Sequence, residues 1–166
     1  MPPPIRIRKQ TTVFAQAGNL TILQDDPQLM KDHRDMKGFA DDIEKLTEEN
    51  TDFRRVLYTG HNLQLVVMSI EPGDEIGEEV HDDRDQFFRI EAGKGEITID
   101  GTVHKVKADD GVVVPQGARH NVKSVGSEPL KLYTIYGPPE HVDGTVHKTC
   151  ADANASHEHF DGKTTE

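Results

Sequence analysis

The feature that most constrains the fold is a series of short strand patterns between residues 63 and 138, each ended by Gly or Pro. Strands of this length, separated by turn residues, are typical of an all-β sandwich or barrel. Asp100-Gly101, between two of these patterns, is a strong signal for a two-residue hairpin. The sequence predicts strands over residues 63–70, 86–91, 96–99, 102–106, 111–115, 120–125 and 130–136.

Composition divides the chain into three parts. Residues 1–36 are polar, show no sustained period, and are expected to form an N-terminal arm. Residues 37–149 are expected to hold the barrel and a preceding helix over residues 37–50, whose apolar residues recur on one face. Residues 150–166 have almost no apolar content, so we expect a disordered polar tail there.

Charge and composition exclude several classes of partner. The formal net charge is −11, and nucleic-acid binding is not expected because phosphate recognition needs clustered Lys and Arg. No apolar run reaches the about 20 residues that a membrane helix needs, and the N-terminus lacks the apolar region of a secretory signal. Cys150 is the only cysteine, which excludes an internal disulfide and fits a reducing compartment. We therefore expect a cytoplasmic protein that does not bind membranes.

Two segments carry side chains suited to a metal site: Gly73-x5-Glu79-x-His81-x4-Gln86-x6-Gly93 and Pro115-x-Gly117-x2-His120. Glu79 and His81 are two residues apart, so on a strand both side chains point to the same face. If that face is the barrel interior, Gln86 and His120 from other strands can meet them there. Two imidazoles, one carboxylate and one amide oxygen suit Fe(II), Mn(II), Ni(II) or Co(II), and zinc less exclusively.

The two segments resemble the paired motifs of the cupin superfamily, Gly-x5-His-x-His-x3-4-Glu-x6-Gly and Gly-x5-Pro-x-Gly-x2-His-x3-Asn. The resemblance covers residues 63–138, and residues 37–149 are similar to small single-domain cupins that are labelled mannose-6-phosphate-isomerase-like. It implies a jelly-roll barrel (a double-stranded β-helix), a divalent metal ion at the barrel mouth, a small-molecule ligand and a homodimer. The implied metal ligands are Glu79, His81, Gln86 and His120.

The chain departs from these motifs at four positions. Glu79 replaces the first His of the first motif and Gln86 replaces its Glu, which keeps one carboxylate among the ligands. In the second motif Asp109 replaces the first Gly and Ser124 replaces the Asn. These last two changes bear on turn geometry and on hydrogen bonds around the ligands.

The remaining candidate residues are interpreted as structural. Three apolar residues are expected in the core and the pocket lining: Phe87, Phe88 and Ile90. His104 is expected on the surface, and residues 157–159 could bind adventitious metal in the tail. His141 and His147 are candidates for anchoring a C-terminal segment or a partner subunit.

Three functions stay open on the sequence alone. The leading hypothesis is a metal-dependent isomerase or lyase for a small sugar-like or other carbonyl compound, in which the ion acidifies an α-proton or a hydroxyl. A non-haem Fe(II) dioxygenase is the first alternative, because such enzymes use two His and one carboxylate with open positions. The second alternative is a non-catalytic ligand-binding or sensing protein. The candidates for proton transfer are Tyr133, Tyr136, Arg89 and His61.

Overall fold

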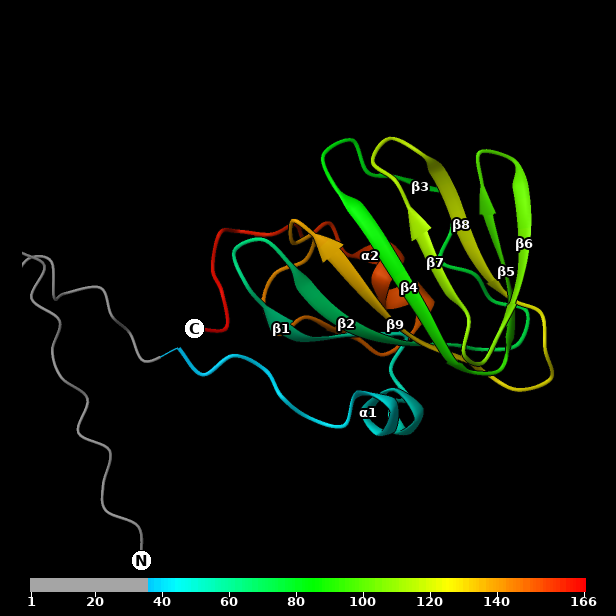
Figure 1. Cartoon of the computed structure of the whole chain (residues 1–166), viewed down its shortest axis with the longest axis horizontal. Coiled ribbons are helices and arrows are strands. Elements are labelled where there is room, and N and C mark those ends of the chain that lie inside the picture. The colour runs from blue at the N-terminus through cyan, green and yellow to red at the C-terminus, as the bar shows by residue number, and fades with distance from the viewer. Residues whose placement is uncertain (1–35) are drawn as a thin grey trace, which may run out of the picture. The chain divides into compact units, whose positions relative to one another are not determined.

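The computed structural model describes residues 36–166, which form ten strands and two short helices (Figure 1). The strands are β1 (Arg54–Thr59), β2 (Gln64–Ile70), β3 (Glu79–Val80), β4 (Asp85–Ala92), β5 (Lys94–Ile99), β6 (Thr102–Lys107), β7 (Gly111–Val114), β8 (Arg119–Ser124), β9 (Leu130–Gly137) and β10 (Val146–His147). The helices are α1 (Ile43–Glu49) and α2 (Cys150–Ala155). The arm predicted over residues 1–36 lies outside the described residues, apart from Met36.

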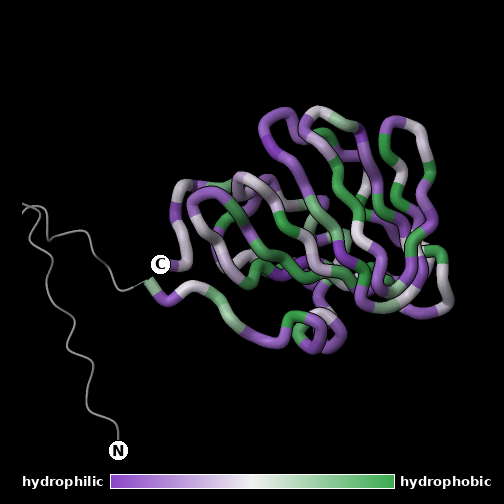
Figure 2. The backbone as a smooth tube through the Cα atoms, in the orientation of Figure 1, coloured by the Kyte–Doolittle hydropathy of each residue, from purple (hydrophilic) through white to green (hydrophobic). Residues whose placement is uncertain are grey.

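The strands form two antiparallel sheets around one core. The larger sheet has the order β10-β1-β2-β9-β4-β7, and the smaller sheet has the order β3-β8-β5-β6. Hydrophobic positions recur along the strands of both sheets (Figure 2). Phe88 and Leu132 of the larger sheet belong to the same buried cluster as Ile97 and Val122 of the smaller one, so the inner faces pack together. This arrangement confirms the predicted all-β jelly-roll fold.

Alternating burial along the central strands decides which side chains reach the interior. The inward positions of β9 are Leu130, Leu132, Thr134 and Tyr136. On β4, Phe88 and Ile90 are fully buried in the core, as the sequence predicts. Phe87 instead lies on the outer face, with its ring centroid 6.3 Å from that of Tyr133, so it does not line an internal pocket.

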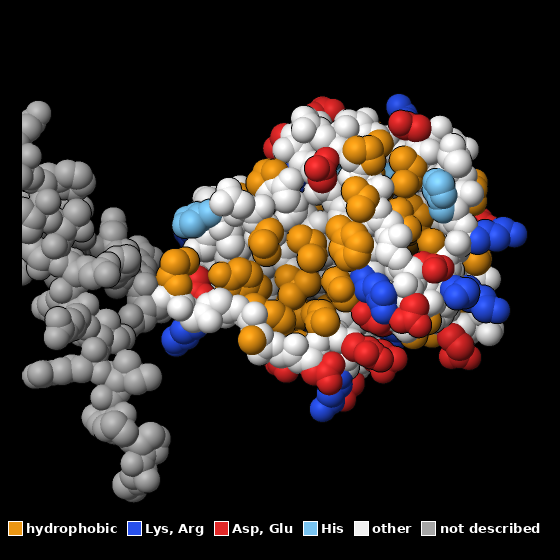
Figure 3. Space-filling view, in the orientation of Figure 1, with side chains coloured by type: hydrophobic (Ala, Val, Ile, Leu, Met, Phe, Trp, Pro, Cys, Tyr) orange, Lys and Arg blue, Asp and Glu red, His pale blue; other side chains and the backbone are white. Residues whose placement is uncertain are grey.

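The outer face of the larger sheet is also apolar. Phe87 and Tyr133 lie on it, and Val113, which is paired in register with Phe87, is 62% exposed. Figure 3 shows hydrophobic side chains gathered over this face. The helix α1 contacts β2, β4 and β9 of the same sheet.

The helix α1 is shorter than the predicted 37–50. It begins after Asp42, whose side chain accepts a hydrogen bond of 3.1 Å from the backbone N–H of Lys45. This is an N-cap, which fixes where the helix starts, so Phe39 precedes the helix. No helix within the described residues is long and apolar enough to cross a membrane.

Residues 150–166 are held by hydrogen bonds, where the sequence predicts a disordered tail. The helix α2 opens with a capping box, in which Thr149 and Asp152 bond each other's backbone N–H groups. The backbone N–H of Phe160 donates to the carbonyl of Glu140 at 2.8 Å, and that of Thr165 donates to a carbonyl of β1 at 2.9 Å. Composition does not reveal this order, because it comes from hydrogen bonds to distant backbone groups and from the packing of Cys150 and Ala153 against the core.

Candidate metal centre

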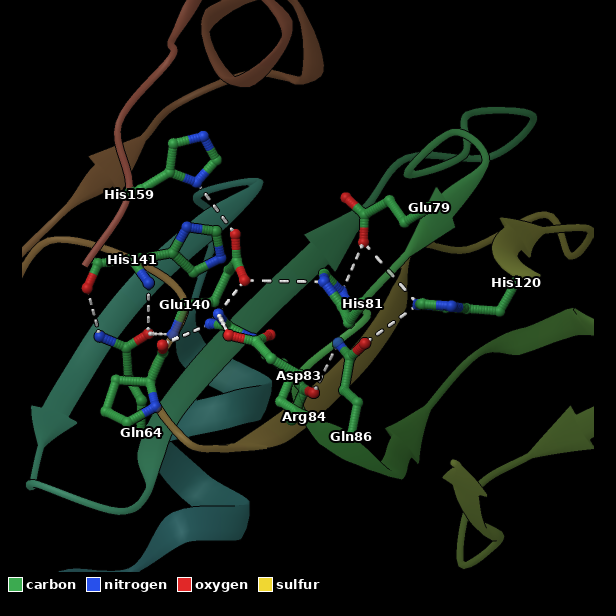
Figure 4. Close-up of polar contacts among 12 residues, drawn as sticks. Gln64, Glu79, His81, Asp83, Arg84, Gln86, His120, Glu140, His141 and His159 are labelled. Carbon is green, nitrogen blue, oxygen red and sulfur yellow. Dashed lines mark hydrogen bonds and ion pairs between the residues drawn. The ribbon is translucent and has the colours of Figure 1, made fainter. Parts of the chain in front are cut away.

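Three potential metal ligands meet inside the barrel where β3 pairs with β8. Glu79 and His120 are directly opposite each other in this antiparallel ladder, so their side chains project to the same side. His81 follows β3 two residues after Glu79 and returns to that side. The ligand atoms of the three residues all lie within 4.8 Å of one another (Figure 4).

The three side chains point at one another without forming hydrogen bonds. Glu79 Oε2 lies 3.6 Å from His81 Nε2 and 3.8 Å from His120 Nε2. His81 Nε2 is buried and has no hydrogen-bond partner within residues 36–166. A buried polar atom of this kind needs an explanation, because native proteins leave few of them unsatisfied. A cation between the three side chains would provide it.

His120 has a hydrogen-bond acceptor on both sides of its ring. Its Nδ1 lies 3.2 Å from the carbonyl oxygen of Ala118, and its Nε2 lies 3.0 Å from Oε1 of Gln86. Burial lowers the pKa of His120, so the ring is neutral and carries one N–H. With that N–H donated to the Ala118 carbonyl, the Nε2 lone pair faces the amide oxygen, and both atoms are available to a metal ion.

Gln86, the predicted fourth ligand, is 1% exposed and lies beside His120. Its Nε2 donates to Oγ1 of Thr134 at 3.1 Å, which turns Oε1 toward the His120 ring. The structure therefore brings all four predicted residues together, three of them as a compact group and Gln86 as a neutral oxygen at its edge.

The protonation state of Glu79 also suits metal binding. Burial works to raise the pKa of this carboxyl, but the neighbouring imidazoles and the Arg54 guanidinium outweigh it and hold the pKa below its usual value. Arg54 Nη2 lies 3.7 Å from Glu79 Oε1. An ionised carboxylate is the form that divalent metals bind.

A second carboxylate, that of Glu140, lies next to Nδ1 of His81, the ring nitrogen that points away from Glu79 and His120. Glu140 Oε2 lies 3.6 Å from His81 Nδ1 and 2.6 Å from Arg84 Nη1, and Arg84 also donates to the carbonyl of Pro139 (Figure 4). A carboxylate on the outer nitrogen is a common way to orient a metal-binding imidazole. The sequence gives no signal for Glu140, because it lies in the loop after β9, outside both motifs.

Of the four candidates for proton transfer, only Tyr136 reaches this site. It is 1% exposed, and its ring meets that of His81 edge-on at 5.8 Å. Burial raises the pKa of Tyr136, which keeps its hydroxyl neutral. Tyr133 and Arg89 occupy outward positions of β9 and β4, and His61 is exposed before β2.

The two departures in the second motif have different outcomes. Asp109 has a φ of 76°, the left-handed conformation for which the motif usually supplies Gly. Arg89 supports it by donating to its carbonyl at 2.9 Å and to its carboxylate at 2.6 Å, so the turn is kept. Ser124 is fully buried, and its Oγ has no hydrogen-bond partner among the described residues.

Comparison with known proteins places the fold and the motifs in one family. The family model described as Cupin domain matches residues 66–136. The uncharacterized protein YrkC of Bacillus subtilis is 43% identical over 134 residues, which cover 77% of this chain and 72% of that protein. The crystal structure of BH2720 from Bacillus halodurans superposes on this chain with a TM-score of 0.71. The two sequences are 43% identical, and the match covers 72% of this chain and 96% of BH2720.

A shorter similarity links the chain to a sugar-nucleotide enzyme. Mannose-1-phosphate guanylyltransferase of Escherichia coli is 26% identical over 76 residues, which cover 46% of this chain but 16% of that enzyme. The similarity therefore concerns one segment of the enzyme and not its whole activity.

Proposed function

Because this chain belongs to the cupin superfamily, we propose that Glu79, His81 and His120 bind a divalent metal ion and that the protein is an isomerase or lyase for a small oxygenated ligand. The observation that carries the proposal is the convergence of one ionised carboxylate and two imidazoles. The Nε2 atoms of both imidazoles face this carboxylate, and none of the described residues donates a hydrogen bond to them. Gln86 adds a neutral oxygen at the edge of this group. Such a donor set suits Fe(II), Mn(II), Ni(II) or Co(II), and zinc less exclusively.

The residues around the triad have separable roles in this proposal. A bound ion supplies Lewis-acid polarisation of the ligand's carbonyl or hydroxyl oxygens. The Ala118 carbonyl lies 3.2 Å from His120 Nδ1 and can hold the direction of that ring, and the Glu140 carboxylate lies 3.6 Å from His81 Nδ1. Tyr136 presents a neutral buried hydroxyl, so it donates a proton or a hydrogen bond rather than acting as a base.

A sugar-like ligand is the preferred class. Vicinal hydroxyl and carbonyl oxygens match a site with open coordination positions. The segment similarity to mannose-1-phosphate guanylyltransferase supports this choice, although it covers only 16% of that enzyme.

The donor set itself favours one second candidate, a non-haem Fe(II) dioxygenase. Two His and one carboxylate on one side of an ion, with the remaining positions open, is the arrangement that oxygen-activating iron enzymes use. The metal identity and the requirement for oxygen separate the two functions.

The test combines elemental analysis with an activity screen under two atmospheres. Protein purified without an affinity tag is analysed for metals and then screened with sugar phosphates, uronates and diketones, with and without air, while oxygen uptake is recorded. We expect turnover that persists without oxygen and that falls in Tyr136→Phe, with Tyr133→Phe as the control on the outer face. Oxygen uptake that needs both Fe(II) and substrate would establish the dioxygenase instead. Protection of the metal from chelators without any turnover would leave a binding or sensing protein.

We also propose a homodimer that functions in the cytoplasm. The apolar outer face of the larger sheet supports the dimer, since Val113 is 62% exposed and hydrophobic side chains gather over this face (Figure 3). Analytical ultracentrifugation of the full-length protein should give twice the chain mass of 18.5 kDa. A monomer at micromolar concentration would contradict the proposal.

A further inference from the structure

Arg54 is a buried cation next to the proposed metal site. It is the first residue of β1, and its side chain is 9% exposed. In the β1–β10 ladder it is paired in register with His147, which is also buried, so both side chains project from the same side of the sheet into the interior.

The guanidinium of Arg54 is poorly satisfied by the protein. Its ion-pair partner among residues 36–166 is Glu79, at 3.7 Å, which is too long for a hydrogen bond. Its Nε is buried and has no hydrogen-bond partner in the described part of the chain. A guanidinium has five N–H donors in a planar arrangement that fits a carboxylate, and a buried Nε–H without an acceptor is rare.

Arg84, whose role is structural, differs from Arg54 in its hydrogen-bond partners. Its side chain is 14% exposed, yet its Nη1 lies 2.6 Å from Glu140 and its Nε lies 2.7 Å from Asp83. Arg84 also donates to a backbone carbonyl. All of its sides are therefore occupied by protein oxygens, whereas Arg54 is left without such partners.

Two more nitrogens near Arg54 lack partners. His147 Nδ1 and His141 Nε2 are buried and have no hydrogen bond to any of the described residues. Burial lowers the pKa of His147, and the positive charge of Arg54 lowers it further, so this ring is neutral. The nearby carboxylate of Glu158 is already bonded to His141 Nδ1 and to a backbone N–H, each at 2.8 Å. The Glu158 carboxylate is thus already engaged by protein donors.

We propose that Arg54 binds the carboxylate of a small hydroxy- or oxo-acid whose other oxygens reach the metal ion at Glu79, His81 and His120. This inference rests on the proposed function and narrows its ligand to carboxylic acids. A carboxylate is favoured over a phosphate because a single guanidinium fork neutralises one negative charge. A dianionic phosphate would leave a second charge beside Glu79.

Three matched probes test the proposal on the full-length protein loaded with Co(II). Glycerate carries two hydroxyls and a carboxylate, glycerol lacks the charge, and glycerol 3-phosphate carries a phosphate instead. Calorimetric titration should show glycerate binding about tenfold or more tighter than glycerol, as expected for a charged hydrogen bond. Arg54→Gln should lose that advantage and leave the weak binding of glycerol unchanged.

Two further variants complete the design. Arg54→Lys keeps the charge without the planar fork, so its affinity for glycerate should lie between those of the native and Arg54→Gln proteins. Arg89→Gln makes the same change of charge on the outer face, where Arg89 pairs with Asp109, and should bind glycerate as the native protein does.

The outcomes separate this inference from the proposed function. A native protein that retains no Co(II) after dialysis overturns the metal site itself. A protein that holds Co(II) but binds glycerate no better than glycerol, or equally well after Arg54→Gln, overturns the role of Arg54 alone. Tighter binding of glycerol 3-phosphate than of glycerate would also contradict the carboxylate assignment.

Discussion

Two buried glutamines lie on either side of Tyr136, one with a structural role and one beside the proposed metal site. The sequence alone does not distinguish them. Gln64 of β2 and Gln86 of β4 are both paired in register with Tyr136 of the intervening strand β9. They are 0% and 1% exposed and point into the same interior. They differ in what their amide groups meet.

Every hydrogen-bonding position of Gln64 is occupied by the protein (Figure 4). Its Nε2 donates to Thr59 Oγ1 at 2.9 Å and to the carbonyl of His141 at 2.8 Å. Its Oε1 accepts from the backbone N–H groups of His141 and Glu140, at 2.9 and 3.3 Å. Gln64 therefore fixes the loop after β9 against β2 and has no free donor or acceptor with which to bind a ligand.

Gln86, in contrast, has an amide oxygen that meets a potential metal ligand. Its Nε2 donates to Thr134, but its Oε1 faces a ring nitrogen of His120 that carries a lone pair when the other nitrogen donates to Ala118. A buried amide whose hydrogen-bonding positions are all occupied by protein groups has a structural role. A buried amide oxygen that faces a potential metal ligand indicates that a cation can bind between them. Four variants test this difference between the two regions.

The largest effect is expected from removing both imidazoles of the proposed site. His81→Ala combined with His120→Ala should reduce bound metal to background, because two of three strong ligands are lost. The barrel should still fold, since its core lies between the sheets. Metal content after dialysis and circular dichroism provide the two readouts. Full metal content in the double variant would refute the assignment of Glu79, His81 and His120.

Gln64→Ala should have the largest effect on stability. It leaves the carbonyl and N–H of His141 and the N–H of Glu140 without their partner in the interior. Each such group costs about 1–3 kcal/mol, so the free energy of unfolding should fall by roughly 3 kcal/mol in urea titrations. Metal content per folded chain should not change. A loss of metal without a loss of stability would reverse the roles of the two glutamines.

Gln86→Ala is the matched counterpart. It should weaken metal affinity by about tenfold, as changes beside metal ligands usually do, and by less than Glu79→Ala, because an amide oxygen is a neutral and weaker donor. Competition with a fluorescent chelator gives both affinities. If Gln86→Ala loses more metal than Glu79→Ala, the ranking of the two ligands is incorrect.

The sequence predicts the fold well where the signals are local. The predicted strand over 130–136 matches β9, and the hairpin at Asp100-Gly101 has φ values of 45° and 81°, as a tight turn of this type requires. No separate strand is predicted over β1, which reads Arg-Arg-Val-Leu-Tyr-Thr. Its inward position at Arg54 is a charge, so the usual alternation of apolar and polar residues is absent there.

The site is predictable only as far as the motif spacing reaches. Glu79, His81, Gln86 and His120 lie within motifs, whereas Arg54 and Glu140 contact these residues from distant positions. No periodic pattern marks a contact between a loop residue and a motif residue. The expectation of a disordered C-terminal tail failed for the same reason, since the hydrogen bonds of Phe160 and Thr165 are made with distant backbone groups.

The smallest effect is expected at Glu158, which ties the C-terminal segment to the loop that Gln64 supports. Burial would raise the pKa of Glu158, but His141 and the N–H of Val142 outweigh it and lower the pKa. A lowered pKa means that the carboxylate stabilises the fold above the ordinary glutamate value of about 4.3, and that this contribution disappears as the pH falls through the lower folded-state pKa.

Glu158→Gln should therefore cost about 0.5–1 kcal/mol at pH 7, a range reduced for partial exposure, and the cost should shrink toward pH 3. Urea midpoints at pH 7, 5 and 3 measure this difference. Glu71→Gln, the same substitution at an exposed carboxylate after β2, serves as the control and should leave the midpoints unchanged. A cost for Glu158→Gln that stays constant between pH 7 and pH 3 would show that the shape of the side chain, rather than its charge, holds the C-terminal segment in place.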